Sequence, residues 1–200
     1  MPLPTLDFMK NNVVKVGVFP RSGKYSAVCV EKSGYYQIEQ GQGQGSFDIY
    51  FCGYSHDQTH MIALGSDADF CFTPKMDGCS FAASAPSPDG TVMVGHANIH
   101  DGINNPEVVA VENLVNKARD KNKSFETLCK LMDLKRETIM ESQQKDLGVA
   151  LGPFGVNNLL DQHNPSYTSP ITTFGIRDSG TWKFYFQVAN SKTVKGVHEF

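Results

Sequence analysis

The sequence predicts an α+β protein built on a β-sandwich or a curled antiparallel sheet. Two observations predict this class. Short alternating or aromatic runs, separated by turn residues, fill the first hundred positions and return after Ile171. Between these two groups of strands, the apolar residues of positions 105–148 recur with a helical period. Strands on both sides of a helical insert indicate that the C-terminal strands join the N-terminal sheet.

The strands before the helices are short, and turn residues separate most of them. Ser33-Gly34 predicts one hairpin, and the run from Pro86 to Gly90 predicts the tip of another. The Gly41–Gly45 run is expected to be a flexible connection, because no Lys-Ser or Lys-Thr follows it to make a phosphate loop. The expected strands are residues 12–19, 24–32, 35–39, 46–54, 61–64, 69–75, 80–85 and 91–98.

Two helices are expected next, and strands follow them. Asn105 followed by Pro106 is typical of a helix start, and the first helix is expected to end near Lys121. Ser124 can cap a second helix, which is expected to end before Gly148. The C-terminal strands are expected at residues 171–177, 182–188 and 193–198.

Length and composition limit the kind of protein this is. Two hundred residues suit one domain, residues 1–200, because single cores commonly reach this size. The net charge of -3 and the lack of a Lys/Arg cluster give no reason to expect nucleic acid. No segment predicts a Sec signal peptide or a membrane span. Five cysteines without a framework spacing indicate free thiols and a reducing working compartment.

The candidate active site is in the hairpin between residues 80 and 98. If its tip centres near Pro88, His96 comes within a residue or two of the position directly opposite Cys79. A thiol and an imidazole in this relation can act as nucleophile and base, because the imidazole takes the thiol proton. Gly78 permits a sharp turn, so that the backbone N–H of Cys79 and a neighbour can form an oxyanion hole.

The run F-T-P-K-M-D-G-C that ends at Cys79 resembles a known family. It is similar to the F-T-x-x-L-S-G-C run of the Burkholderia lethal factor family of glutamine deamidase toxins. That family belongs to a wider group that includes the catalytic domain of cytotoxic necrotizing factor. Thr73 and Cys79 match the pattern, and His96 is the first histidine after the cysteine. Asp77 stands where the family has serine, and the interval from Cys79 to His96 is longer.

The resemblance implies a curled antiparallel β-sandwich with peripheral helices that hydrolyses a glutamine side chain of a host protein to glutamate. It implies catalytic roles for Cys79 and His96, with Thr73 orienting the imidazole through its hydroxyl or its backbone carbonyl. The substrate would be a translation-initiation RNA helicase or a Rho-type GTPase, reached in the host cytoplasm after secretion or injection without a Sec signal. We expect a monomer that needs no metal or organic cofactor.

Several alternatives stay open at this point. The fold can also serve as a binding module without enzymatic activity, with Cys79 buried. A Cys-His protease or a transglutaminase shares the same acyl-enzyme. Asn98 and His100 follow His96 and compete for roles near the thiol. Cys52, His56 and His60 have spacings that suit zinc but lack an evident fourth ligand. The other cysteines are expected to be packing residues: Cys29, Cys52, Cys71 and Cys129.

Overall fold

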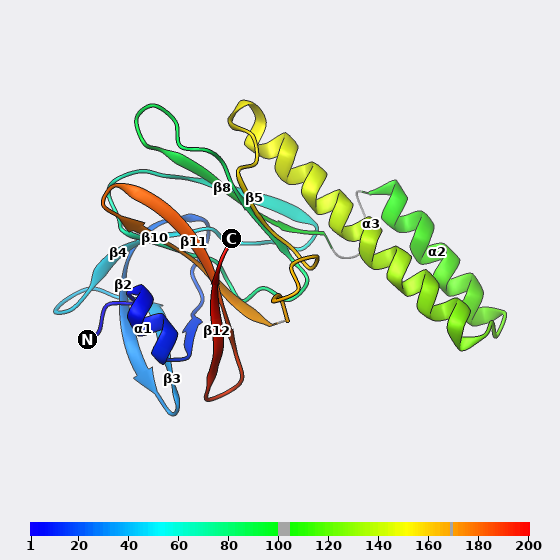
Figure 1. Cartoon of the computed structure of the whole chain (residues 1–200), viewed down its shortest axis with the longest axis horizontal. Helices are drawn as coiled ribbons and strands as arrows, with labels where there is room; N and C mark the ends of the chain where they lie inside the picture. Colours follow the sequence, from blue (N-terminus) through cyan, green and yellow to red (C-terminus); the bar gives the residue numbers. More distant parts are fainter. Residues whose placement is uncertain (100–104, 169) are drawn as a thin grey trace.

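Two β-sheets form the body of the protein, and a pair of helices extends from it (Figure 1). The computed structural model describes residues 1–99, 105–168 and 170–200. The order of elements along the chain is strands, then two long helices, then strands again. The α+β class expected from the sequence is therefore confirmed.

The larger sheet has eight strands in the order β1-β3-β2-β4-β6-β10-β11-β12. The β1–β3 and β4–β6 pairs are parallel, and the other pairs are antiparallel, so the sheet is not purely antiparallel. The β6–β10 pair places Phe72 beside Phe174 and confirms that the C-terminal strands join the N-terminal sheet. The strand bounds are β1 Val14–Val16, β2 Gly23–Lys32, β3 Tyr35–Gln40, β4 Phe47–Phe51, β6 Phe70–Phe72, β10 Ile171–Asp178, β11 Thr181–Ala189 and β12 Val194–Glu199.

The smaller sheet has the order β5-β8-β7-β9 and is antiparallel throughout. Its central pair, β7 and β8, is the hairpin expected from the sequence. Ser87 closes the tip, because its backbone N–H and its hydroxyl both donate to the Thr91 carbonyl. The short β9, which precedes the C-terminal strands, was not expected. The bounds are β5 Gln58–Leu64, β7 Ser80–Ala83, β8 Val92–Asn98 and β9 Asn158–Leu160.

Alternation along β7 and β8 decides which residues face the core between the sheets and which face a helix. Phe81 and Val94 pack in one cluster with Phe184 and Phe186 of the larger sheet. The residues between them on these strands, such as Ala82, turn to the other face. A second cluster fills the curl of the larger sheet beneath α1 (Leu6–Asn11), a helix that periodicity did not reveal.

The two long helices are α2 (Pro106–Asp120) and α3 (Phe125–Leu151), with a 3₁₀ turn η1 (Gly152–Phe154) after them. Asn105 and Ser124 cap them as expected, because each side chain accepts backbone N–H groups of the first turn. The expected end of the second helix before Gly148 was wrong. Leu147 and Leu151 both bury their side chains against the smaller sheet, and this burial outweighs the roughly 1 kcal/mol cost of a helical glycine.

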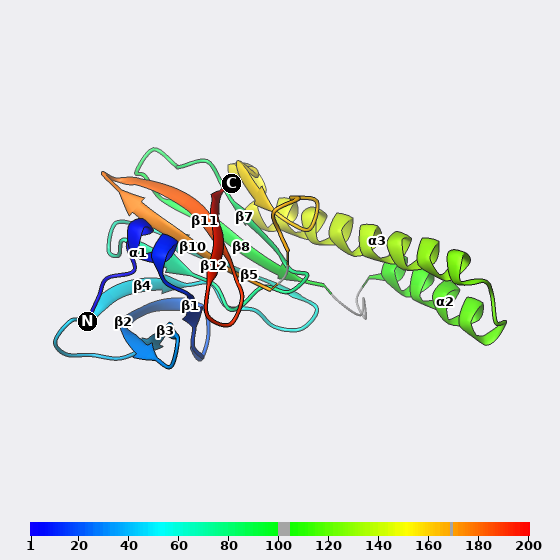
Figure 2. The ribbon, with the colours of Figure 1, turned by 60° about the horizontal axis from the view of Figure 1, so that its bottom comes forward.

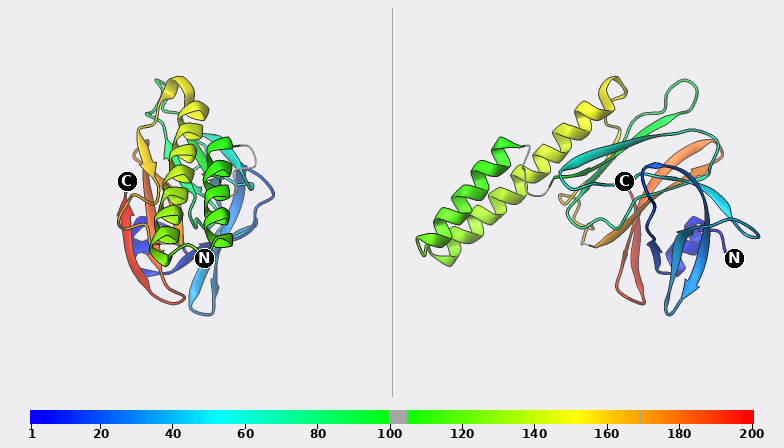
Figure 3. Two further views of the ribbon diagram at one scale, coloured as in Figure 1. Left: turned by 90° about the vertical axis from the view of Figure 1, so that its right-hand side faces the viewer. Right: turned by 180° about the vertical axis from the view of Figure 1, so that it is seen from behind.

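Only the C-terminal part of α3 covers the smaller sheet. The rest of α3 and all of α2 extend beyond the sheets as an antiparallel pair, which we call the helical arm (residues 106–139; Figure 2). The view from behind in Figure 3 shows the same projection from the opposite side. Within the described part of the chain, neither the arm nor any other helix has the length and apolar content needed to cross a membrane.

Candidate active site

Cys79 lies at the turn that leads into β7, at one end of the smaller sheet. Gly78 just before it has φ +93°, a backbone conformation that glycine adopts without strain. Tyr167 holds this turn from the C-terminal half of the chain. Its hydroxyl accepts the Gly78 N–H at 3.2 Å and donates to the Cys79 carbonyl at 3.0 Å. The turn that carries the thiol is therefore fixed by a side chain 88 residues away.

Asn98 is the side chain that faces the thiol. The β7–β8 register pairs Ser80 with Ala97 and Phe81 with His96, so continuing it by one residue places Cys79 opposite Asn98. The Cys79 Sγ donates to Asn98 Oδ1 at 3.4 Å. The expectation that His96 comes within a residue or two of the position opposite Cys79 is confirmed, with an offset of two.

His96 shares a strand face with Cys79 and Asn98, because residues two apart on a strand point the same way. The diagonal relation puts its Cα about 7–8 Å from that of Cys79. The imidazole is fully buried, and its ring centroid lies 5.8 Å from that of Tyr54. Neither ring nitrogen has a hydrogen-bond partner among the described residues. Both ring nitrogens of His96 are therefore without a hydrogen-bond partner in the described structure, next to the hydrogen-bonded pair of Cys79 and Asn98.

Burial keeps both groups neutral in this structure. The pKa of the Cys79 thiol is raised to about 11, mainly by desolvation; the Asp77 backbone N–H favours the thiolate and opposes this rise, and the Asp77 carboxylate contributes to it. Desolvation lowers the pKa of His96 to about 4, and the Cys52 backbone, which favours the charged ring, opposes this. A neutral thiol and a neutral imidazole are the starting state for general-base catalysis rather than a preformed thiolate–imidazolium pair.

Gln143 of α3 links the turn that carries the thiol to the end of β8. Its Nε2 donates to the carbonyl of Gly78 at 3.1 Å and to that of Ile99 at 3.0 Å, and its Oε1 accepts the hydroxyl of Ser80 at 2.6 Å. The side chain is fully buried, so these bonds are not exchanged with bulk water. The amide of one residue thus fixes the position of Cys79 relative to the end of β8.

Thr73 does not take part in the hydrogen bonds around Cys79 that are described above. It is fully buried, its hydroxyl donates to the carbonyl of Pro74 at 2.9 Å, and its backbone N–H donates to that of Thr173. The unpartnered nitrogens of His96 show that neither the hydroxyl nor the carbonyl of Thr73 holds the imidazole in this structure. Its orienting role stays a prediction of the resemblance.

The remaining cysteines and the zinc pattern have ordinary surroundings. Cys29, Cys52 and Cys71 are buried, and Cys129 is partly exposed on α3. The Cys52 thiol points to the His60 carbonyl at 3.6 Å, while the His60 ring bonds to Ser55. Among residues 1–99, 105–168 and 170–200, no three His, Cys, Asp or Glu side chains are grouped to hold a metal ion.

A groove opens beside the thiol turn, between that turn and the helical arm. It has a volume of about 370 Å³, and we call it the arm groove. Gly78 and Asn98, the two residues that adjoin and contact Cys79, line its inner end. Residues of α2 and α3, from Glu112 to Met140, line the rest. A substrate lying in this groove would reach the side of the thiol turn.

Comparison with solved structures finds a distant structural relative. No family model matches the chain, and no curated protein matches it. The C-terminal domain of CNFy from Yersinia pseudotuberculosis is similar at 11% identity and a TM-score of 0.37, over 90% of this chain and 72% of that one. This relative is not Burkholderia lethal factor. A likeness this distant gives no information about activity.

Sequence reasoning missed two residues that position the thiol. Gln143 and Tyr167 lie 65 and 88 residues from the backbone groups they bind, and neither belongs to a motif. Asn98 was expected only as a competitor near the site; the structure makes it the last residue of β8, on the same face as His96. His100, the other competitor, lies outside the described residues.

Proposed function

We propose that this protein is a cysteine-dependent amidohydrolase that converts a glutamine side chain of a host protein to glutamate. The observation that supports it most is that long-range hydrogen bonds fix the turn that carries Cys79. Tyr167 and Gln143 fix the backbone on both sides of the thiol, and Asn98 contacts the sulfur itself. A thiol that only fills core space does not require such fixed flanking backbone.

The proposed reaction starts from the neutral pair. His96 takes the Cys79 proton as the sulfur adds to the carboxamide carbon. The imidazolium then protonates the departing nitrogen and the C–N bond breaks. Ammonia departs, and the substrate stays bound to Cys79 as a thioester. His96 next deprotonates a water molecule that adds to the thioester carbon. The C–S bond breaks, the imidazolium of His96 returns its proton to the sulfur, and the carboxylic acid that forms loses its proton to water and leaves as a carboxylate.

The oxyanion that forms in each half needs donors. The Gly78 N–H is engaged by Tyr167, so it is not one of them. The backbone N–H of Cys79, with the side-chain amide of Asn98, is our candidate pair. Asn98 Oδ1 accepts from the thiol at 3.4 Å, so the amide has to turn its Nδ2 towards the carbon that the sulfur attacks.

The substrate, the place of action and the monomeric state remain proposals from the sequence resemblance. The resemblance names a translation-initiation RNA helicase or a Rho-type GTPase as host substrate, and secretion or injection into the host cytoplasm. Intact-mass spectrometry of each candidate after incubation tests this. We expect a gain of about one dalton, from amide to acid, in one glutamine-containing peptide. No gain should occur with Cys79→Ala.

A non-enzymatic binding module is the second candidate, because the thiol is only 6% exposed and burial raises its pKa. Iodoacetamide labelling separates the two functions. Labelling of Cys79 in the folded protein at pH 6, well before unfolding, supports the enzyme, whereas inertness until unfolding supports the binding module. The experiment uses a Cys129→Ser background, because Cys129 is partly exposed and would otherwise add its own labelling.

A further inference from the structure

The arm groove has charged side chains of both signs in its lining. Asp77 lies at the inner end, beside Gly78 and the thiol turn. Arg119 of α2 and Arg136 of α3 line the groove from the arm. The two helices that contribute them run side by side, as the end-on view of Figure 3 shows.

Two other charged residues of the described lining neutralise each other. Glu112 and Lys135 form an ion pair between α2 and α3. Their opposite charges cancel and give the groove no net preference. Asp77 is paired with Lys75 as well, so the electrostatic character of the described lining is decided by the two arginines on the arm.

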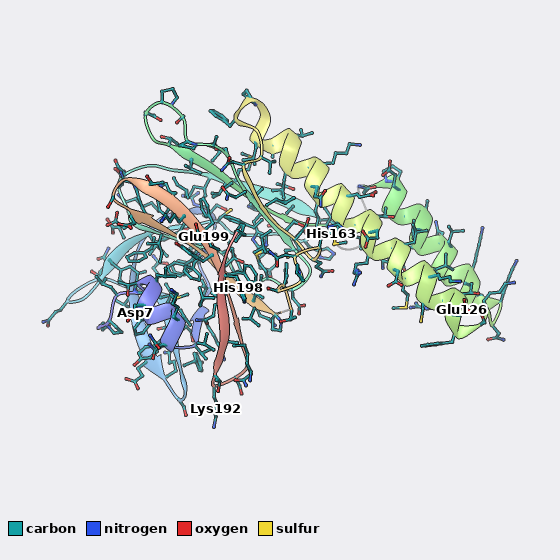
Figure 4. The ribbon with its side chains drawn as sticks, viewed as in Figure 1. Asp7, Glu126, His163, Lys192, His198 and Glu199 are labelled. Carbon is teal, nitrogen blue, oxygen red and sulfur yellow. The ribbon has the colours of Figure 1, made fainter. Side chains whose placement is uncertain are left out.

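Both arginines keep donors for a ligand. Arg119 is exposed and forms no ion pair within the described part of the chain. Arg136 Nη2 is 3.7 Å from Glu137 Oε1, which is too long for a hydrogen bond. The other oxygen of Glu137 is bonded to His163 Nε2 at 2.9 Å, and Figure 4 shows His163 beside α3. A guanidinium has five N–H donors in a fork that matches a carboxylate.

The floor between the ends is apolar and suits an extended chain. Val115, Met132, Ile139 and Met140 line it. From Met132 to Met140 is eight residues of helix, about 12 Å at 1.5 Å per residue. An extended polypeptide covers that length with three to four residues at about 3.3 Å each.

We propose that the arm groove binds an acidic segment of the substrate protein, with Asp or Glu side chains three to four residues from the target glutamine. The neutral carboxamide would lie at the inner end, beside the thiol turn. The acidic side chains would lie against Arg119 and Arg136. This inference rests on the proposed function, because that function makes the Gly78 end of the groove the reacting end.

A binding experiment tests the groove without the reaction. The full-length Cys79→Ala protein is titrated with fluorescein-labelled peptides that carry one glutamine, with two Asp or two Lys three and four residues away, in both chain directions. Fluorescence anisotropy measures Kd. We expect at least tenfold tighter binding of an Asp peptide than of its Lys counterpart. The double variant Arg119→Glu/Arg136→Glu should lose this preference or reverse it.

The matched control is Lys117→Glu/Lys130→Glu. It makes the same change in net charge with one residue on each helix, and neither lysine lines the groove. It should keep the preference for the Asp peptide. Equal binding of the Asp and Lys peptides, or an equal loss of preference in the control, would overturn the groove proposal and leave the proposed function standing.

A second measurement separates the groove from the chemistry. The glutamine of each peptide is replaced by 6-diazo-5-oxonorleucine, an electrophilic analogue, and labelling of Cys79 is followed by mass spectrometry. We expect the Asp peptide to label the wild-type protein at least ten times faster than the Lys peptide. Selective binding of the Asp peptide without any labelling of Cys79 would instead refute the proposed function and retain the acidic-segment site.

Discussion

The Cys79 thiol donates its hydrogen bond to Asn98 Oδ1 at 3.4 Å, and not to the imidazole of His96. Asn98 is thus the direct partner of the sulfur. His96 lies two residues before Asn98 on β8, on the same strand face. This division gives each residue a different expected effect on substitution. Asn98 contacts the thiol at the groove, whereas His96 is buried with two unpartnered nitrogens.

Cys79→Ser and Cys79→Ala should abolish amide hydrolysis without unfolding the protein. A serine hydroxyl is too weakly acidic for this base to ionise, so activity should fall by several orders of magnitude. Ammonia release measures the activity, and circular dichroism checks the fold. Cys71→Ala, a change at a buried cysteine of the larger sheet, is the control. Ammonia release near the wild-type rate in either Cys79 variant would contradict the nucleophile.

His96→Ala should lose activity and slow the alkylation of Cys79, because the proton acceptor for the thiol is gone. We expect a decrease of about 10²- to 10⁴-fold in amide hydrolysis. His60→Ala is the matched control: His60 lies opposite His96 in the β5–β8 register and bonds to Ser55. If His60→Ala reduced alkylation and His96→Ala did not, the assignment of the base would be wrong.

The stability of the protein should fall at mildly acidic pH because of His96. Its pKa is lowered from about 6.5 to about 4, so below pH 6.5 the unfolded chain binds a proton that the folded protein does not. The contribution of His96 is fully present above pH 6.5 and is lost as the pH falls towards 4. The change amounts to roughly 3 kcal/mol of unfolding free energy.

Urea unfolding at several pH values measures this dependence. His96→Phe removes the titrating group and keeps a ring beside Tyr54. The difference between the two stability curves isolates His96, because all other groups titrate in both proteins. Parallel curves between pH 7 and pH 4 would show that His96 is accessible to protons in the folded state.

Gln143→Leu should reduce both stability and activity. It leaves the hydroxyl of Ser80 and the carbonyls of Gly78 and Ile99 without this partner, at about 1–3 kcal/mol for each group left unsatisfied. Because the thiol turn is no longer tied to the end of β8, amide hydrolysis should fall about 10- to 100-fold. The pH profile of Cys79 alkylation should shift as well, and a purely structural role would leave it unchanged.

Gln144→Leu serves as the control for this variant. The neighbouring glutamine donates to Asp161 Oδ2 at 2.6 Å and contacts neither flank of Cys79. It should lower stability by about 1 kcal/mol and leave the alkylation profile unchanged. Identical profiles for the Gln143 and Gln144 variants, measured under conditions where both are folded, would show that Gln143 does not position the thiol.

The sequence by itself determined most of the strands, the starts of the two long helices and the local turns. Period-two runs marked the β2–β3 and β7–β8 hairpins, and Asn105 and Ser124 marked the helix starts, because these signals depend only on neighbouring residues. The hairpin pattern also placed the thiol and the imidazole within two residues of alignment. A local pattern constrains the register of a hairpin because its turn is short.

The tertiary structure decided the rest. Helix α3 passes Gly148 because Leu147 and Leu151 bury against a sheet that the local sequence does not describe. Gln143 and Tyr167 reach the Cys79 turn from 65 and 88 residues away, and contacts at such separations leave no periodic signal. The low pKa of His96 likewise follows from complete burial, which depends on the packing of both sheets and not on the residues beside it in the chain.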